Sequence, residues 1–400
     1  MTPAPNRPPL SERSLLLLLA AVQFTHIMDF MIMMPLGPQL MRELAISPRQ
    51  FGALISTFAI TAGAVGLAVA PFADRFDRRK LLLVCYAGFT LGTLACGLAT
   101  GYGSLMVARA LCGAFGGVSG ATIMAIVADV VPPERRARGM GIIMTAFSAA
   151  AALGVPLGLK IAQWWKWEGP FLVIAAVAAV VWTCLLRVLP PVTRHLVGEP
   201  RSIRDFLGLL RDGNAWKGLA LMMVMVFGHF TIIPYLSPFL VGNTGLLEKN
   251  LFLIYLTGGV VTIFTGPWIG RLADAHGRFH IYACLVGAAC AVIFLLTHSG
   301  PQPLWQTLLL AACFFAFASG RFVPGQAVIS LAVPPARRGA FMSLIACSRD
   351  LAAGLTATFG GMIVAEGPGG RILHFDRLGW CAIAVSIGSL WLFRSLQSAE

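Results

Sequence analysis

The sequence GLAVAPFADRFDRR at residues 66–79 joins an apolar run to a short charged loop, and IGRLADAHGR at residues 269–278 does the same 200 positions later. Both copies contain the dipeptide Ala-Asp. A second pair of loops, VPPERR at 131–136 and VPPARR at 333–338, repeats at an offset of 202. Two loop types that recur together at nearly the same spacing indicate an internal duplication of about 200 residues.

Apolar runs surround these loops throughout the chain. Hydrophobic residues make up 57% of the 400 positions and charged residues only 12%, about half the charged share of a soluble domain, which excludes a soluble globular protein. A run of roughly 20 apolar residues crosses the ~30 Å hydrocarbon layer of a bilayer as a helix. The sequence predicts twelve such spans, at 15–36, 50–70, 81–100, 103–128, 139–162, 169–189, 216–241, 250–270, 281–299, 304–332, 340–364 and 376–395.

The spans form two groups of six, so we predict an all-α membrane protein built from two pseudo-symmetric six-helix bundles. The polar segment between the groups carries Ile203, Phe206, Leu207 and Leu210 at helical spacing between charges, which predicts an amphipathic helix. The predicted organisation is a cytoplasmic tail at 1–14, a first bundle at 15–189, a cytoplasmic linker at 190–215, a second bundle at 216–395 and a cytoplasmic tail at 396–400.

The basic residues follow this topology. If the N-terminus is cytoplasmic, 20 of the 30 Lys and Arg residues lie on the cytoplasmic side and 7 on the opposite side. The positive-inside rule therefore predicts that both termini are cytoplasmic. Basic clusters that are scattered between spans do not predict nucleic-acid binding. The first span is too long for a signal peptide, so we expect it to stay in the mature chain. The absence of an Asn-x-Ser/Thr sequon fits a bacterial inner membrane, where we expect the protein. We also expect it to be a monomer.

Several catalytic and ligand-binding patterns are missing from the sequence. The nine cysteines lie inside apolar runs and show no CxxC or His/Cys spacing, which predicts free thiols and no metal site. There is no GxxxxGK loop, HExxH motif or Ser/His/Asp arrangement. We therefore expect no enzymatic activity and no cofactor, and a gradient rather than ATP as the source of energy.

The charged loops resemble the major facilitator superfamily, whose loops after spans two and eight run Gly, three residues, Asp, Arg or Lys, one residue, Gly, Arg, then Arg or Lys. The first copy has Ala70 and Asp77 at the two glycine positions, whereas the second keeps both glycines and loses a base. The resemblance implies a transporter with a gate made of breakable cytoplasmic clamps, the alternative being charges that only set the topology. Its gate residues would be Asp74, Arg75, Arg78, Asp129, Arg135, Arg136, Gly270, Asp274, Gly277 and Arg278.

Spans one, four and five carry further resemblances to this superfamily. Arg109 is followed by four glycines, as in its span-four motif, and GxxxG spacing allows close helix contact. Gly154-Val155-Pro156-Leu157-Gly158 is similar to part of its antiporter motif, and Asp29 is similar to an acid of the twelve-span drug and sugar efflux branch. The residues expected to serve in helix packing and the antiporter motif are Gly113, Gly117, Gly154, Pro156 and Gly158.

Asp29 and Arg109 are predicted to meet inside the membrane. At ~1.5 Å per residue, Asp29 lies ~21 Å above the cytoplasmic end of span one and Arg109 lies ~9 Å below the opposite end of span four, which is the same level in a ~30 Å layer. We expect Asp29 to accept the coupling proton and Arg109 to be its charge partner. The alternative is a fixed salt bridge between the spans. His26, one turn below Asp29, either relays the proton or only forms a hydrogen bond.

The second half carries its own intramembrane charges. Arg321 of span ten and Arg349 and Asp350 of span eleven lie at matching depths, ~14–16 Å from the cytoplasmic ends of their helices. One arginine then exceeds the number of acids, and a surplus guanidinium in a central cavity predicts an anionic ligand group. The alternative is a network that only ties the two spans together. His229, before Pro234 in span seven, is a further cavity candidate, and the prolines there predict a kink.

Together these features predict a secondary active transporter that works by alternating access and exports a small organic solute in exchange for protons. Its partners would be the solute, protons and the lipid bilayer. The alternatives are a proton symporter that imports an organic anion, a lysolipid transporter or flippase on the same fold, and a membrane sensor without transport activity.

Overall fold

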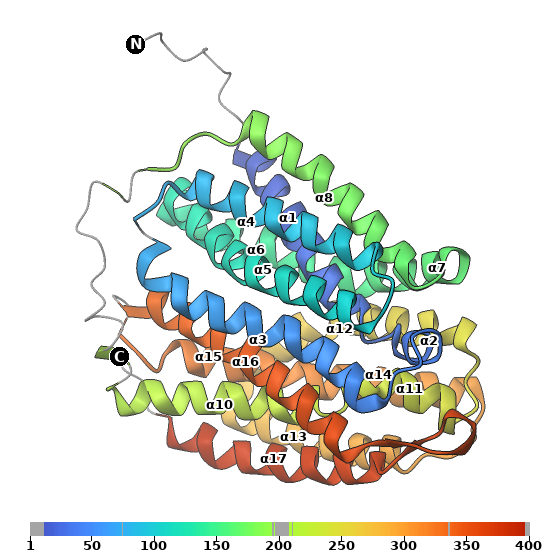
Figure 1. Cartoon of the computed structure of the whole chain (residues 1–400). Coiled ribbons are helices and arrows are strands. Elements are labelled where there is room, and N and C mark those ends of the chain that lie inside the picture. The colour runs from blue at the N-terminus through green and yellow to red at the C-terminus, as the bar shows by residue number, and fades with distance from the viewer. Residues whose placement is uncertain are drawn as a thin grey trace.

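The computed structural model describes residues 12–73, 75–193, 196, 208–209, 211–334 and 337–396, without the side chains of residues 133, 134 and 137. Nearly all of this is helix (Figure 1). The helices of the first half are α1 (Glu12–Ile32), α2 (Gly37–Glu43), α3 (Pro48–Ala73), α4 (Arg78–Gly97), α5 (Tyr102–Val130), α6 (Pro133–Ala149), the π-helix η1 (Ala150–Gly154), α7 (Val155–Trp165) and α8 (Glu168–Val188).

The second half repeats this plan after the linker and adds a short hairpin before its last helix. Its elements are α10 (Gly213–Phe230), α11 (Ile233–Asn243), η3 (Glu248–Asn250), α12 (Leu251–His276), α13 (Arg278–Thr297), α14 (Leu304–Phe314), the π-helix η4 (Phe315–Ser319), α15 (Phe322–Ser330), α16 (Arg338–Ile363), β1 (Ala365–Glu366), η6 (Pro368–Gly370), β2 (Ile372–Leu373) and α17 (Phe375–Ser395).

The all-α membrane fold is confirmed. Within the described ranges, eleven helices are long and apolar enough to cross a membrane, counting a span across each internal break. The twelfth long helix, α16, has 26 residues but carries Arg349 and Asp350 at its centre, which lower its hydropathy. The predicted amphipathic helix of the linker falls on residues 197–207 and 210, outside the described residues.

Three of the spans are interrupted near their centres, each shortly before a proline. Span five passes through η1 before Pro156, span seven breaks at residues 231–232 before Pro234, and span ten passes through η4 before Pro324. Proline lacks the N–H that would bond the carbonyl four residues earlier, so the preceding turn widens or breaks. The kink predicted for span seven is therefore present, and Pro234 is placed to produce it.

The two groups of helices lie on either side of a long contact. In Figure 1 most helices of the first half, blue to green, occupy the upper part of the view, and most of the second half occupies the lower part, with α3 and α16 side by side between them. We call the end where α1 begins and α17 ends the termini side, and the opposite end the far side. A Cβ on Gly63 or Gly354 would come within 2.6–2.7 Å of Leu351 or Ile60, so these glycines let α3 and α16 pack closely.

Helix α5 packs against α3 through the glycines that follow Arg109. A Cβ built on Gly113 would lie 2.2 Å from the carbonyl oxygen of Phe58, and one on Gly117 would lie 2.4 Å from that of Ala62. Backbone atoms cannot move aside as a flexible side chain can. The predicted packing role of these two glycines therefore has a direct steric basis.

Gly117→Val is expected to lower the melting temperature, because its side chain would collide with the backbone of α3, and overpacking of this kind costs about 1–3 kcal/mol. Gly120→Ala is the matched control, since the nearest atom to its new Cβ would be 3.9 Å away. Thermal unfolding of the purified protein measures both changes. Equal melting temperatures for the two variants would contradict this packing.

Candidate functional site

The centre of the first half holds a buried ion pair. Arg109 on α5 donates through Nη1 to Asp29 Oδ2 on α1 over 2.6 Å, and the same nitrogen lies 3.2 Å from the Asp29 carbonyl oxygen. Both side chains are 0% exposed. The Arg109 guanidinium also lies 4.4 Å from the centroid of the Phe58 ring. The two charges that the sequence places at one level are therefore in contact, and each neutralises the other.

This ion pair leaves hydrogen-bonding capacity unused. Asp29 Oδ1, Arg109 Nε and Arg109 Nη2 are buried and have no hydrogen-bond partner among the described protein atoms. The contact is therefore made through one guanidinium nitrogen instead of the two-pronged arrangement that arginine and carboxylate prefer. A pair held at a single point separates more readily than a two-pronged one, while loss of one partner would leave a lone buried charge.

His26 lies one helical turn from Asp29 on α1. Its ring packs at 5.4 Å from the ring of Phe89 and 5.8 Å from that of Phe58, and it fits only because α5 has glycine at position 116. Nε2 is buried and without a partner, while the residue as a whole is half-buried. No hydrogen bond joins His26 to Asp29. The side chain therefore lies beside the ion pair but does not take part in it.

Arg349 and Asp350 form the only ion pair within α16 among the described residues. Arg349 Nε and Nη2 both lie 3.0 Å from Asp350 Oδ1. Although they sit at the middle of the helix, the two side chains are 51% and 26% exposed. On the same helix, Cys347 and Leu351 pack against Gly63 of α3. The Arg349–Asp350 pair is therefore exposed at the level where α16 meets the first half.

Arg321 does not join that pair. Its side chain is 0% exposed, and its nitrogens donate to Ser386 Oγ over 2.6 Å and to the Met225 carbonyl over 3.1 Å. The expectation that the surplus arginine lines a central cavity is therefore wrong for Arg321, because its helix turns it toward α10 and α17. Depth along a helix can be counted from the sequence, but rotation about the helix axis depends on packing.

His229 also lies inside the second half instead of in an open cavity. It is 8% exposed, and its ring stacks on Phe314 with centroids 5.5 Å apart and an interplanar angle of 4°. Phe230 and Phe322 lie edge-on to the same ring. The predicted cavity role has no geometric support here, since aromatic rings enclose the imidazole on three sides.

The first charged loop ties helix ends together within the first half. Arg78 pairs with Asp129 at 2.9 Å, and outside this loop, at the start of α6, Arg135 pairs with Glu12 at 3.1 Å. Asp77, at a position where the superfamily usually has glycine, caps α4 by accepting from the Arg79 and Val192 backbone N–H groups. The predicted Asp74 lies outside the described residues. The loop thus connects α4, α5 and the segment after α8.

The remaining predicted gate residues make fewer contacts. Arg75 lies over the ring of Phe72 at 5.4 Å, and Arg136 has a buried Nε without a partner. In the second copy, Asp274 and Arg278 are exposed and form no ion pair with any described residue. Gly277 has a φ of +88°, a backbone conformation that strongly favours glycine, and it separates α12 from α13. A Cβ on Gly270 would lie 3.8 Å from Val323 Cγ1, so substitution there meets no steric barrier.

The antiporter-like segment of span five packs against span one. A Cβ on Gly154 would lie 2.4 Å from Met28 Sδ, and one on Gly158 would lie 2.6 Å from Ile32 Cδ1. Pro156 is buried between the two glycines. These residues flank the α1 turn that carries Asp29, so this segment helps to hold the acid in place.

Sequence analysis missed the contacts that join the halves on the far side. Arg42 on α2 pairs with Glu248 at 2.7 Å, and this hydrogen bond raises the pKa of Arg42 and keeps it charged. Thr358 donates to Ser56 Oγ at 2.7 Å, deeper in the same interface. Such partners are separated by 206 and 302 positions. The only feature of the sequence that could have indicated one of these contacts is the opposite charge of Arg42 and Glu248.

No group of three His, Cys, Asp or Glu side chains that could hold a metal ion occurs in the described parts of the chain. All nine cysteines are free thiols.

The family model of the Major Facilitator Superfamily matches residues 19–357 and 249–397. The chain therefore belongs to the Major Facilitator Superfamily, whose members are transporters and not enzymes.

The relatives agree with this assignment over most of the chain. It is 24% identical to the uncharacterized MFS-type transporter YbcL of Bacillus subtilis (strain 168) over 364 residues, covering 89% of this chain and 90% of YbcL. It is 26% identical to YtbD of the same organism over 314 residues, covering 78% of each chain. These bacterial relatives imply a location in a cell membrane.

Solved structures share the fold. A bacterial homologue of the human lysosomal transporter Spinster, inward-facing and occupied, superposes with a TM-score of 0.75 at 15% identity over 96% of both chains. The human organic anion transporter MFSD10 (TETRAN) gives 0.70 at 18% identity, covering 97% of this chain and all of that one. At these identities the likeness extends to the fold alone.

Removal of Arg109 is expected to destabilise the protein strongly. Arg109→Gln leaves Asp29 as a lone buried carboxylate, and breaking a buried pair in this way costs about 3–5 kcal/mol. Adding Asp29→Asn to that variant should restore much of the loss, because the buried charge is then gone. The melting temperatures of the two single variants and the double variant measure this coupling.

Arg135→Gln is the control, since its pair with Glu12 is solvent-exposed and such pairs are worth at most about 1 kcal/mol. If the losses in the two single variants simply add in the double variant, the two charges do not depend on each other.

Proposed function

We propose that this protein is a secondary active transporter that exports a small organic solute in exchange for protons, with both termini in the cytoplasm of a bacterial inner membrane. The observation that carries the proposal is the fully buried Asp29–Arg109 pair. A buried carboxylate held by one arginine nitrogen can exchange that attraction for a proton, because protonation neutralises the acid and releases the arginine.

Protonation of Asp29 is the first step. The neutral carboxyl no longer attracts Arg109, whose guanidinium then needs other acceptors and favours a different arrangement of α1 and α5. Helix α1 also packs on α6, η1, α7 and α8, and α5 packs on α3 and α4. The state of one proton is thereby coupled to the packing of the whole bundle.

The contacts between the halves support a state that is closed on the far side. Arg42–Glu248, Ser56–Thr358 and a hydrogen bond from Gln163 to the Lys249 carbonyl all lie between the middle of the molecule and its far side. Among pairs in which both residues are described, no side-chain hydrogen bond or ion pair joins the halves on the termini side. Opening toward the far side would therefore require these contacts to break.

The charged loops would act when that change occurs. In the present state Arg78–Asp129 holds α4 to α5 within the first half, and Asp274 and Arg278 are unpaired among the described residues. We assign to the first loop the role of keeping the helix ends of its bundle together while the bundles rock. The second loop would bind new partners after closure on the termini side.

A second candidate function differs from the proposal in the direction of transport. Arg349 is 51% exposed between the halves and can meet an anion, which favours import of an organic anion with protons. MFSD10, which shares the fold, is an organic anion transporter. Arg349 is, however, already neutralised by Asp350, and Arg321 is enclosed. Export therefore remains the better supported function, and the lipid flippase has no observation in its favour.

A test of the proposed function first requires a solute that the protein binds. A thermal-shift screen of sugars, drugs, organic acids and lysolipids on the purified protein selects the compound that stabilises it most, because a ligand that binds only the folded form raises the melting temperature.

In proteoliposomes, opposite pH gradients should drive net fluxes of that radiolabelled compound in opposite directions. In each case the compound should move in the direction opposite to the protons. Asp29→Asn should reduce gradient-driven flux to the level of protein-free vesicles while solute-for-solute exchange continues, because the binding site is intact but the proton acceptor is gone. Asp376→Asn is the control, since Asp376 is an exposed acid in the first turn of α17.

Net flux of the compound in the same direction as the protons would identify the symporter instead. Wild-type coupling in Asp29→Asn would refute the assignment of Asp29.

A further inference from the structure

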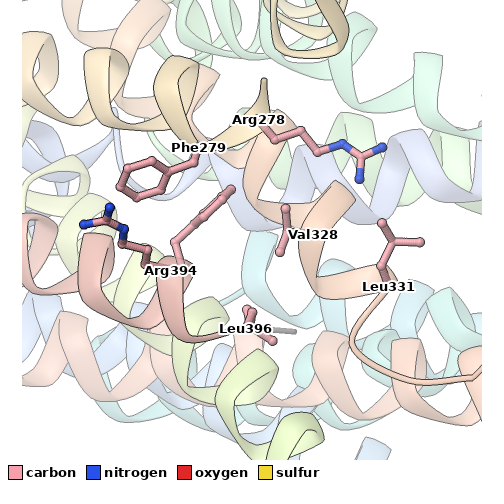
Figure 2. A pocket seen from close by; sticks show the side chains of 7 residues that line it. Arg278, Phe279, Val328, Leu331, Arg394 and Leu396 are labelled. Carbon is pink, nitrogen blue, oxygen red and sulfur yellow. The ribbon is translucent and has the colours of Figure 1, made fainter. Parts of the chain in front are cut away.

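A separate pocket opens on the termini side of the second half. It lies between the start of α13, the end of α15 and the end of α17, and has a volume of about 300 Å³. Figure 2 shows the side chains that line it. Two are arginines and five are apolar: Arg278, Phe279, Val328, Leu331, Phe393, Arg394 and Leu396.

The two arginines carry charge that no acid compensates. Arg278 and Arg394 are both exposed, and neither has a carboxylate within 4.0 Å among the described residues. Arg394 lies 5.3 Å from the centroid of the Phe279 ring, which orients its guanidinium without neutralising it. Asp274, one turn before Arg278, forms no ion pair with it. The rim of the pocket is therefore an anion-attracting surface.

The floor of the pocket is apolar, and exposed apolar side chains lie near it on α17. Phe393 is 5% exposed and stacks on Tyr282 of α13. Two residues before Phe393 on α17, Trp391 is 74% exposed, and Ile387, one further turn away, is 54% exposed. An exposed tryptophan near a helix end is typical of the membrane interface. The same ligand can thus meet positive charge at the rim and apolar surface below it.

We propose that this pocket binds the headgroup of an anionic phospholipid, with Arg278 and Arg394 donating hydrogen bonds to its phosphate oxygens and the first carbons of its acyl chains lying along α17. Arginine recognises phosphate through its fork of N–H groups, and basic pockets between helices at a membrane surface suit lipid headgroups. A soluble anion would gain nothing from the five apolar side chains.

The spacing of the two arginines favours a particular lipid. In Figure 2 the guanidinium groups of Arg278 and Arg394 point to opposite sides of the pocket. Two guanidinium groups on opposite sides suit a headgroup with two phosphates, which cardiolipin carries. The proposal therefore ranks cardiolipin above phosphatidylglycerol, which has one phosphate and the same sign of charge. It does not depend on the direction of transport.

Native mass spectrometry of the full-length protein in detergent tests the site with cardiolipin, phosphatidylglycerol and phosphatidylethanolamine added separately. The double variant Arg278→Gln, Arg394→Gln should bind cardiolipin at least about tenfold more weakly, because both guanidinium groups that meet phosphate are removed. Leu331→Trp should weaken binding with both arginines present, since it fills the pocket.

Arg13→Gln is the matched control, because Arg13 is an exposed arginine at the start of α1 on the same side and lies outside the pocket. It should bind cardiolipin as the wild type does. The melting temperature of each variant without lipid establishes that it is folded, and Arg394→Lys supplies a second, milder change that should weaken binding less than Arg394→Gln.

Equal cardiolipin binding by wild type, double variant and control would overturn the proposal. So would full displacement of the lipid by millimolar inorganic phosphate, because the ligand would then be a soluble anion. A preference for phosphatidylethanolamine would overturn it as well.

Discussion

The attraction between Asp29 and Arg109 is the interaction on which the arrangement of the first half depends. A charged side chain at the centre of a bilayer costs on the order of 3 kcal/mol even on the gentler scales, and here two such side chains are fully buried. Neither can be accommodated alone, so α1 and α5 must bring them together. The close packing of α5 on α3, which glycines allow, fixes the position of Arg109. The span-five glycines do the same for the α1 turn with Asp29.

The second half accommodates its buried charge in a different way. Arg321 is equally buried, but a serine hydroxyl and a backbone carbonyl surround it in place of an acid. The acid near the middle of a span in this half, Asp350, pairs with Arg349, and both side chains are partly exposed. The duplicated halves thus share helices and loops but differ in their charges. The enclosed ion pair belongs to one half and the exposed pair to the other, which suits a division between energy coupling and contact with solute.

Sequence analysis predicted the spans well because the hydropathy of a span can be read from its consecutive residues. The bounds of α4 and α8 agree with the prediction within a few residues, and the break in span seven follows from Pro234. The contact of Asp29 with Arg109 could be anticipated because both depth and opposite charge were available. The positions of Arg321 and His229 could not, since helix rotation is set by packing. Arg42–Glu248 joins residues 206 positions apart, and nothing local indicates such a contact.

Distances between the halves, measured by electron paramagnetic resonance at different pH values, test the central claim most directly. One pair of spin labels at positions 72 and 342 reports on the termini side, and a second pair at 43 and 247 reports on the far side; all four residues are exposed. If Asp29 exchanges Arg109 for a proton, acidification should lengthen the far-side distance and shorten the other, and Asp29→Asn should remove this dependence on pH. An unchanged pH response in Asp29→Asn would contradict the account.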